Sequence, residues 1–313
     1  MSTNDSNQYV RLRQNVFNSV AVTVMVIMSV AMFTYINSVM LFALQRKAIF
    51  RETPRYILFT HLLCSDTINL IFSFIVFILA VIFIKIAKAV CSVILFLCSS
   101  TFINSPLYLS VMSLERYVAI CFPLRHSEIA TQKKTSLAVI IIWFLGTVNS
   151  VIDILFTSIM DPTFFTSTMI CKREGFIITS WQGNMAKIFN ASYFVVVAAV
   201  ILFTYISIIR IARSVSSDEE SAKKPQKTVL LHLVQLVLCL NSFLYAFIDV
   251  SLASISSGVL LNYLLYLNFL VVLILPRCLS PLIYGLRDEA LKPFFFYYFT
   301  FHIKKVKPRG NIN

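Results

Sequence analysis

The residues of this chain best suited to chemistry are charged side chains that interrupt or end long apolar stretches. Asp66 and Arg277 each stand within such a stretch, and Glu115 and Arg116 stand together at the end of another. An ionised group held away from water is costly unless another group pairs with it. We therefore expect these residues to bind a counter-ion or one another.

Catalytic chemistry finds little support. The four His residues form no spacing typical of metal ligands, and the seven Cys residues match no zinc site. A hydrolase embedded in a membrane would need paired acids, a Ser/His arrangement or a His cluster, and the sequence suggests none of these. We expect no metal, no cofactor and no enzymatic activity.

The elements that position the charges follow from an apolar composition. Of the 313 residues, 58% are hydrophobic and 13% are charged, about half the charged share expected of a soluble domain. The mean hydropathy is +0.81. With 28 Phe and 13 Tyr against 6 Gly, the chain has more apolar surface than one water-facing fold can hide. This excludes a soluble enzyme and a disordered chain, and it predicts a membrane protein.

Seven apolar runs reach the roughly 20 residues that a helix needs to cross a bilayer. They are predicted near residues 16–44, 56–84, 91–121, 135–160, 188–211, 228–251 and 262–286. Backbone groups in hydrocarbon must be bonded within their own segment, so all seven are predicted to be helices. The expected fold class is an all-α bundle of seven transmembrane helices.

Lys and Arg residues predict the orientation of the bundle. Most of them fall in segments 45–55, 116–134, 210–227 and 287–313. Because loops rich in Lys and Arg stay in the cytoplasm, we expect an extracellular tail at 1–15, a helical domain at 16–286 and a cytoplasmic segment at 287–313. No cleavable signal is expected at the polar start of the chain. Topology thus explains the net charge of +13 without nucleic acid.

Cys91 and Cys171 are the cysteines that this orientation places on the oxidising side. Cys91 opens the third predicted helix, and Cys171 lies in the outer loop between the fourth and fifth helices. The other five lie within helices or at their inner ends. A Cys91–Cys171 disulfide is therefore predicted, and the alternative is two free thiols.

The end of the third helix carries the most specific motif, since residues 112–126 read MSLERYVAICFPLRH. A charged pair at a helix end is often only a solvated terminus. The continuation into RYVAIC and PLRH, however, closely resembles the inner end of helix three in vertebrate odorant receptors, a branch of the rhodopsin-like G-protein-coupled receptors. The chain looks most like the odorant receptors of fish.

Other segments along the chain resemble the same family. Asn37 and Asp66 look like the polar residues of its first two helices, and Trp143 looks like its helix-four Trp. Residues 53–56 (TPRY), 204–205 (TY) and 280–288 (SPLIYGLRD) are similar to further family motifs. The departures are Ser280 in place of the usual Asn, the lack of Pro in the fifth and sixth predicted helices, and a single Cys in the second outer loop.

The resemblance implies a receptor of the plasma membrane that activates a heterotrimeric G protein, with arrestin and a receptor kinase as further partners. It implies that Glu115 holds Arg116 in the inactive state and that Arg116 then meets the G protein. The coupling residues implied by the motifs are Glu115, Arg116, Tyr117, Tyr205, Pro281 and Tyr284. For the tyrosines, the alternative is simple anchoring at the membrane interface.

The resemblance also implies a ligand cavity between the outer halves of helices three, five, six and seven. Its expected lining is mostly aromatic or apolar, which suits a small, largely apolar odorant with one or two hydrogen-bonding groups. An amine is disfavoured because helix three has no acid before Glu115. The candidates are Cys98, Ser99, Phe102, Ile103, Phe189, Tyr193, Phe194, Asn241, Leu244, Tyr245, Phe247, Tyr266 and Leu270.

A polar core is expected from the same resemblance, at a level where related receptors often hold a sodium ion. Its members are Asn37, Asp66, Ser105, Arg277 and Ser280. We expect Arg277 to pair with Asp66 and to take the place of the ion. The alternative is that Arg277 reaches water or bonds only backbone carbonyls.

Three further expectations concern the ends of the chain and the function class. Asn4 begins the sequon Asn4-Asp5-Ser6 and is the predicted glycosylation site. Residues 287–301 should form a helix on membrane lipid. The alternatives to an odorant receptor are a non-olfactory rhodopsin-like chemoreceptor, an orphan receptor or a transporter, and the last should show helices broken by Gly and Pro, for which 6 Gly give little support.

Overall fold

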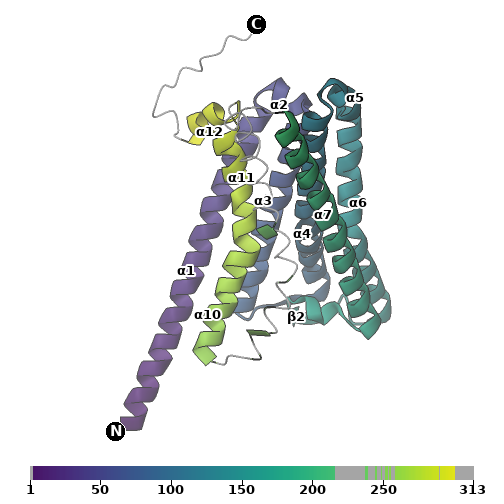
Figure 1. Ribbon diagram of the computed structural model, residues 1–313. Coiled ribbons are helices and arrows are strands. Elements are labelled where there is room, and N and C mark those ends of the chain that lie inside the picture. Colours follow the sequence, from purple (N-terminus) through teal and green to yellow (C-terminus); the bar gives the residue numbers. More distant parts are fainter. Residues whose placement is uncertain are drawn as a thin grey trace.

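The computed structural model describes residues 3–215, 258–288 and 290–299, with short pieces at 237–238, 244, 248, 251–252 and 254. Helices make up most of this part of the chain (Figure 1). The long ones are α1 (Thr3–Gln45), α3 (Pro54–Val81), α4 (Lys88–Cys121), α6 (Gln132–Met160) and α7 (Ser180–Val215). The predicted sixth span, 228–251, lies almost wholly outside the described residues.

Shorter elements join and close the long helices. The seventh predicted span consists of α10 (Gly258–Asn268), the π-helical segment η4 (Phe269–Ile274) and α11 (Leu275–Arg287), and α12 (Lys292–Phe299) follows it. The remaining short elements are α2 (Ala48–Glu52), β1 (Lys85–Ala87), η1 (Pro123–Arg125), α5 (His126–Ile129), β2 (Thr168–Ile170) and η2 (Arg173–Phe176).

Five helices in the described part are long and apolar enough to cross a membrane, namely Thr23–Gln45 of α1, α3, α4, α6 and Ser180–Ile211 of α7. They match the first five predicted spans, with differences at their ends. The helix of α1 already begins at Thr3, so most of the predicted tail 1–15 is helical. The second span ends at Val81 because residues 85–87 join a sheet.

Local sequence explains where several helices begin. Pro54 stands at the first position of α3, where its missing N–H has no helical partner to lose. Thr131 precedes α6, and its hydroxyl oxygen accepts the backbone N–H of Lys134 at 3.3 Å. Within α4 and α11, Pro106 and Pro281 are tolerated as they are in other membrane helices.

Helix α4 lies at the centre of the described bundle and packs against α3, α6 and α7 (Figure 1). Its approach to α6 depends on Gly146, where a Cβ atom would overlap the side chain of Asn104 and the carbonyl of Ser100. With its amide nitrogen turned toward α6, Asn104 donates to the Ile142 carbonyl at 3.1 Å. A small residue opposite a hydrogen-bonding amide is a common way to bring membrane helices together.

The bundle has two distinct ends. Strands β1 and β2 pair antiparallel, with Lys85 opposite Ile170 and Ala87 opposite Thr168. We call this the sheet end. Figure 1 shows α2, α5 and α12 gathered at the opposite end, which we call the α12 end. Helix α4 runs from one end to the other and carries candidate functional residues along its whole length.

Candidate functional site

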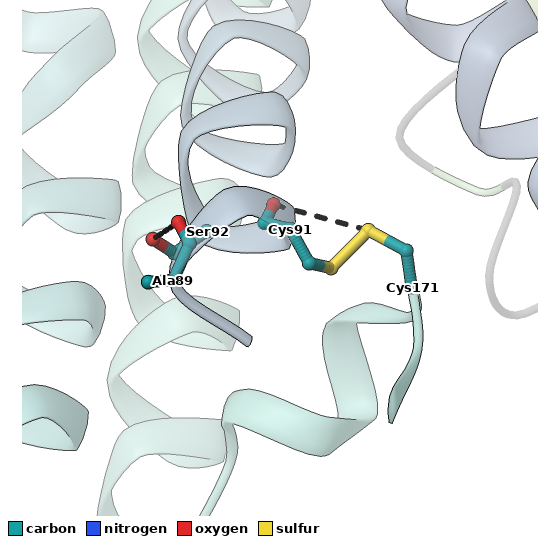
Figure 2. The surroundings of a disulfide bond; sticks show 4 residues. All are labelled: Ala89, Cys91, Ser92 and Cys171. Atoms are coloured by element: carbon teal, nitrogen blue, oxygen red, sulfur yellow. Dashed lines mark hydrogen bonds between the residues drawn. A yellow bond between two sulfur atoms is a disulfide. The ribbon is translucent and has the colours of Figure 1, made fainter. Parts of the chain in front are cut away.

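At the sheet end, a disulfide joins α4 to the segment after β2. Cys91 lies in the first turn of α4, and its Cα is 5.5 Å from that of Cys171 (Figure 2). Both cysteines are fully buried, in a cluster with Phe164 and Phe176. The predicted disulfide is therefore confirmed.

A second contact at the sheet end is ionic. Lys88 Nζ donates to Asp161 Oδ2 at 2.6 Å, and the two side chains are only 11% and 18% exposed. The other carboxylate oxygen accepts the backbone N–H of Thr163 at 2.9 Å and its hydroxyl at 2.7 Å. The hydrogen bond from Lys88, followed by those from Thr163, lowers the pKa of Asp161 to about 2. Asp161 therefore stays ionised at any physiological pH.

Gln182 completes the sheet end and was missed by the sequence reasoning. Its side chain is 1% exposed, and its amide oxygen accepts the backbone N–H of Ile178 at 2.8 Å. Its amide nitrogen donates to the Phe176 carbonyl at 3.2 Å and to the Thr157 hydroxyl at 3.3 Å. Nothing in the sequence distinguishes this Gln, because its partners come from a loop whose path only the fold defines.

Three of the predicted ligand-lining residues are half-buried in the bundle. Phe102 and Cys98 on α4 are half-buried, and the Phe102 ring centroid is 5.1 Å from Cζ of Arg277. The Cys98 sulfur is 3.9 Å from the Ser73 hydroxyl. Tyr266 of α10 is also half-buried, with its ring 5.8 Å from that of Phe77.

Other predicted lining residues lie elsewhere or are already engaged. The Tyr193 hydroxyl donates to the Leu145 carbonyl of α6 at 2.7 Å, so the protein itself takes up this hydroxyl. Ile103 is buried in the main core. Ser99, Phe189 and Leu270 are half-buried, and Phe194 and Leu244 are exposed. Asn241, Tyr245 and Phe247 lie outside the described residues.

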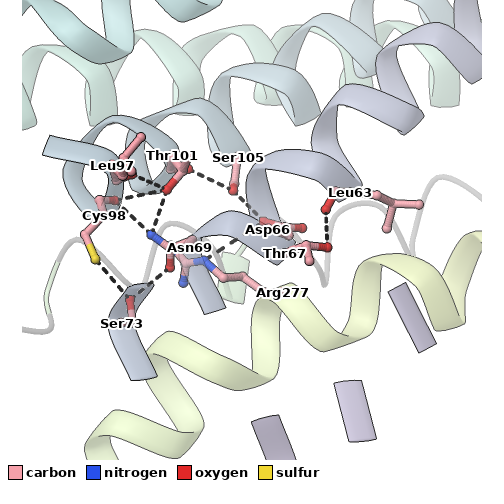
Figure 3. A network of polar contacts seen from close by, with 10 residues as sticks. All are labelled: Leu63, Asp66, Thr67, Asn69, Ser73, Leu97, Cys98, Thr101, Ser105 and Arg277. Carbon is pink, nitrogen blue, oxygen red and sulfur yellow. Dashed lines mark hydrogen bonds and ion pairs between the residues drawn. The ribbon is translucent and has the colours of Figure 1, made fainter. Parts of the chain in front are cut away.

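Between α3, α4 and α11, the structure brings Asp66, Ser105 and Arg277 together (Figure 3). Ser105 Oγ donates to Asp66 Oδ1 at 2.5 Å, and Arg277 Nε is 4.0 Å from the same oxygen. Asn37 of α1 is fully buried, but its side-chain amide has no hydrogen-bond partner among the described residues. The Ser280 side chain lies outside the part of the chain that is described.

Asn69 extends this network and was not singled out from the sequence. Its amide nitrogen donates to the Cys98 carbonyl at 2.8 Å and to the Thr101 hydroxyl at 3.2 Å (Figure 3). The Ser73 hydroxyl donates to its amide oxygen at 3.4 Å. The available signal was spacing, because residues three and four apart share a helix face and Asn69 follows Asp66 by one turn.

At the α12 end, Glu115 pairs with a residue that the sequence reasoning did not propose. Its Oε1 is 3.1 Å from His126 Nε2, at the start of α5. Among the described residues no ion pair joins Glu115 to Arg116. The expectation that Glu115 binds Arg116 directly is therefore corrected. Consecutive residues of a helix point in different directions, which leaves Glu115 turned toward the following loop. The charged groups around Arg116 are Arg55, Glu115 and Asp288.

The contacts of Asp288 are the second unforeseen feature of the α12 end. It is 7% exposed and forms an ion pair with Arg55 at 2.6 Å. It also accepts the Tyr56 hydroxyl at 3.1 Å and the backbone N–H groups of Ala290 and Leu291 at 3.0 and 3.1 Å. One carboxylate therefore links the start of α3 to the turn that leads into α12.

The remaining coupling candidates vary in what the structure describes. The Tyr117 ring packs edge-on against Phe122 and Phe203, at 5.8 and 5.3 Å between centroids. Tyr205 is half-buried and Pro281 is buried. For Tyr284 the backbone lies in α11, and its side chain is outside the described part.

Comparison with known proteins identifies the family. Residues 36–284 match the family "7 transmembrane receptor (rhodopsin family)". Odorant receptor 131-2 of Danio rerio is 32% identical over 262 residues, which cover 83% of this chain and 80% of that receptor. Olfactory receptor-like protein OLF3 of Canis lupus familiaris is 28% identical over 59% of this chain and 58% of its own.

A third relative extends the same pattern. Olfactory receptor 4E2 of Mus musculus is 27% identical over 63% of this chain and 62% of its own. The family match confirms the predicted bundle of seven helices, and it identifies a membrane receptor rather than an enzyme. This chain belongs to the rhodopsin family of seven-transmembrane receptors and is close to the odorant receptors.

Proposed function

We propose that this receptor binds a small odorant inside the bundle, which it enters from the sheet end, and that it activates a heterotrimeric G protein of the stimulatory, cAMP-raising type at the α12 end. The observation that carries the proposal is the similarity to a zebrafish odorant receptor over 83% of the chain. The two ends of α4 supply the physical basis.

The orientation that goes with this proposal puts the sheet end outside the cell, in the plasma membrane. A disulfide is stable in an oxidising compartment, and Cys91–Cys171 lies at the sheet end. Basic residues are abundant at the α12 end, where Arg46, Lys47, Arg51 and Arg55 surround α2. The positive-inside rule favours the cytoplasm for that end.

The ligand that fits the predicted lining residues is small and largely apolar. Phe102 and Tyr266 provide half-buried aromatic surface, while Cys98 and Ser99 provide weak or single hydrogen-bonding groups. Sites of this composition gain affinity from apolar burial and take their orientation from a few polar groups. We propose one or two hydrogen-bonding groups on the odorant.

Coupling is proposed to depend on an exchange of partners at the α12 end. Glu115 is engaged by His126 rather than by Arg116, so Arg116 need not break a direct ion pair before it meets a G protein. An Arg at a helix end can bind the carbonyl groups of an incoming helix through its several N–H donors. Arrestin and a receptor kinase are proposed to use the same end.

The test is a ligand screen in cells that report cAMP, followed by Arg116→Ala. We expect the variant to reach the cell surface and to lose the odorant-evoked rise in cAMP. The matched control is Arg125→Ala, because the Arg125 side chain is 74% exposed and its ion pair in the described part of the chain is a surface contact with Glu128 at 3.8 Å.

Three outcomes separate the alternatives. An evoked cAMP rise that Arg116→Ala leaves intact would contradict the coupling role. A response to non-volatile mediators and to no odorant would favour a non-olfactory chemoreceptor. Uptake of solute into vesicles that contain the receptor without G protein would favour a transporter.

A further inference from the structure

Asp66 and Arg277 form a charge pair in the middle of the bundle, far from either end. Their side chains are 1% and 4% exposed, and Arg277 Nε is 4.0 Å from Asp66 Oδ1. A charge buried within membrane helices is costly when it is alone, and a nearby opposite charge offsets part of that cost. Among the described residues, Asp66 and Arg277 together add no net charge to the polar core.

Related receptors often hold a sodium ion at this level, bound by oxygen atoms such as those of Asp66 and Ser105. The residues present do not fit such an ion. The Ser105 hydroxyl donates its hydrogen to Asp66 Oδ1 at 2.5 Å, and the guanidinium of Arg277 approaches the same oxygen. A sodium ion would have to stand beside a fixed positive charge, and like charges at that separation repel strongly where little water screens them.

We propose that Arg277 is the resident counter-ion of Asp66, so that the receptor holds no sodium ion in its polar core and its stability does not respond to sodium. This inference concerns the resting protein and does not depend on the odorant or on the G protein.

A tethered cation also differs from a free one in what it connects. Arg277 belongs to α11, its charge partner Asp66 belongs to α3, and its Cζ lies 5.1 Å from the ring of Phe102 on α4. Figure 3 shows Arg277 reaching from α11 toward the polar residues of the two other helices. A sodium ion can leave for water, whereas the Arg277 guanidinium stays tethered to α11 through its own side chain. Arg277 is thus a positioning residue that ties three helices together.

The first experiment measures the midpoint of thermal unfolding of the purified full-length receptor in sodium, potassium and choline chloride at equal ionic strength. We expect the wild type to show the same midpoint in all three salts. Arg277→Ser should unfold at a lower temperature in choline chloride and should regain stability as sodium replaces choline, because Asp66 is then without its cation. The control is Ser73→Ala, whose hydroxyl contacts Asn69 and Cys98 in the same network.

Two results of this experiment would overturn the proposal. One is a stabilisation of the wild type that is specific for sodium. The other is an Arg277→Ser variant that is as stable as the wild type in choline chloride, since Arg277 would then not be neutralising Asp66.

The second experiment measures surface expression of Arg277→Met, Asp66→Asn and the double variant, and poor folding is itself the readout. Each single change removes the opposite charge from a buried pair, so each should lower surface expression by roughly tenfold. The double variant removes both charges and should recover a clear part of the loss. A double variant no better than the worse single variant would contradict the pairing.

Discussion

The two ends of α4 are held by different kinds of contact. At the sheet end, Cys91 is bonded to Cys171, and Lys88 is paired with Asp161 at 2.6 Å with little exposure to water. At the α12 end, Glu115 meets His126 at 3.1 Å, and the His126 side chain is 31% exposed. The first set includes a covalent bond, and the second can be exchanged for other partners.

This difference teaches where α4 is able to move. A disulfide and a shielded ion pair hold the first turn in one position, whereas a partly exposed contact such as Glu115–His126 contributes about 1 kcal/mol or less. A change in the middle of α4 should therefore appear as displacement at the α12 end. The asymmetry gives a physical reason for a ligand and a partner protein to act at opposite ends of one helix.

The largest expected effect comes from breaking the fixed end. Cys91→Ser and Cys171→Ser should each abolish surface expression, and the double variant should be no worse than either. The bond closes a loop between residues 80 apart in sequence, and loop entropy alone gives about 4.5 kcal/mol for a closure of that length. Surface labelling checks this, with Cys121→Ser at the other end of α4 as the tolerated control. External thiol reagents that label both cysteines in a functional receptor would contradict the prediction.

A smaller effect is expected at the exchangeable end. Glu115→Gln and His126→Phe both weaken or remove the Glu115–His126 contact and should raise ligand-independent cAMP by about fivefold, the equilibrium shift that corresponds to about 1 kcal/mol. The control is Glu128→Gln, because Glu128 is exposed and, among the described residues, forms an ion pair only with Arg125, at 3.8 Å. Unchanged basal cAMP in both variants would mean that the contact does not restrain the α12 end.

The pH dependence of stability tests the ion pair at the sheet end. The folded pKa of Asp161, about 2, is below its ordinary value of 3.8, so the pair with Lys88 adds stability above about pH 4 and loses it as the pH falls toward 2. Lys88→Met should therefore lower the unfolding temperature near neutral pH and reduce its fall in acid. Lys85→Met, on the exposed side of β1, is the control. Parallel pH profiles for Lys88→Met and the wild type would count against the ion pair.

The smallest effect concerns the sugar at the start of the chain. Asn4→Gln should remove the gel shift produced by glycosidase, with no change in unfolding temperature. Asn190→Gln should keep the shift, because Asn190 lies well inside α7, which begins at Ser180. A shift that survives Asn4→Gln and disappears in Asn190→Gln would reverse this assignment.

Much of the fold could be predicted from apolar run length, because a bilayer imposes a minimum helix length and the hydropathy of the sequence reports it. The positions of helix ends could not. The β1–β2 pairing shortens the second span, and it depends on strands far apart in sequence. The extra turns at the start of α7 are set by the contacts of Gln182 rather than by hydropathy.

The candidate site shows the same division. The Cys91–Cys171 pair could be predicted because topology leaves few cysteines on one side. Side-chain partners were harder to foresee. Arg116 follows Glu115 in the sequence, but the side chain that contacts Glu115 is that of His126. The pairing of Asp288 with Arg55 was missed because residues so distant in the chain carry no mutual pattern. Tyr193 was expected to face a ligand, and its hydroxyl instead donates to the Leu145 carbonyl. The direction in which a helix residue points depends on how the helices pack.

The π-helical segment η4 has a consequence for the phase of the seventh helix. Such a segment accommodates a surplus residue within an otherwise α-helical run. Each residue advances an α-helix by about 100°, so deletion of one residue within 269–274 would turn α10 and α11 by that angle relative to each other. The helix could then keep the contacts of Tyr266 and Phe269 with Phe77 or the contact of Arg277 with Asp66. It could not keep both sets of contacts at once. The extra residue thus lets the two parts of one helix present side chains in two different directions around the helix axis.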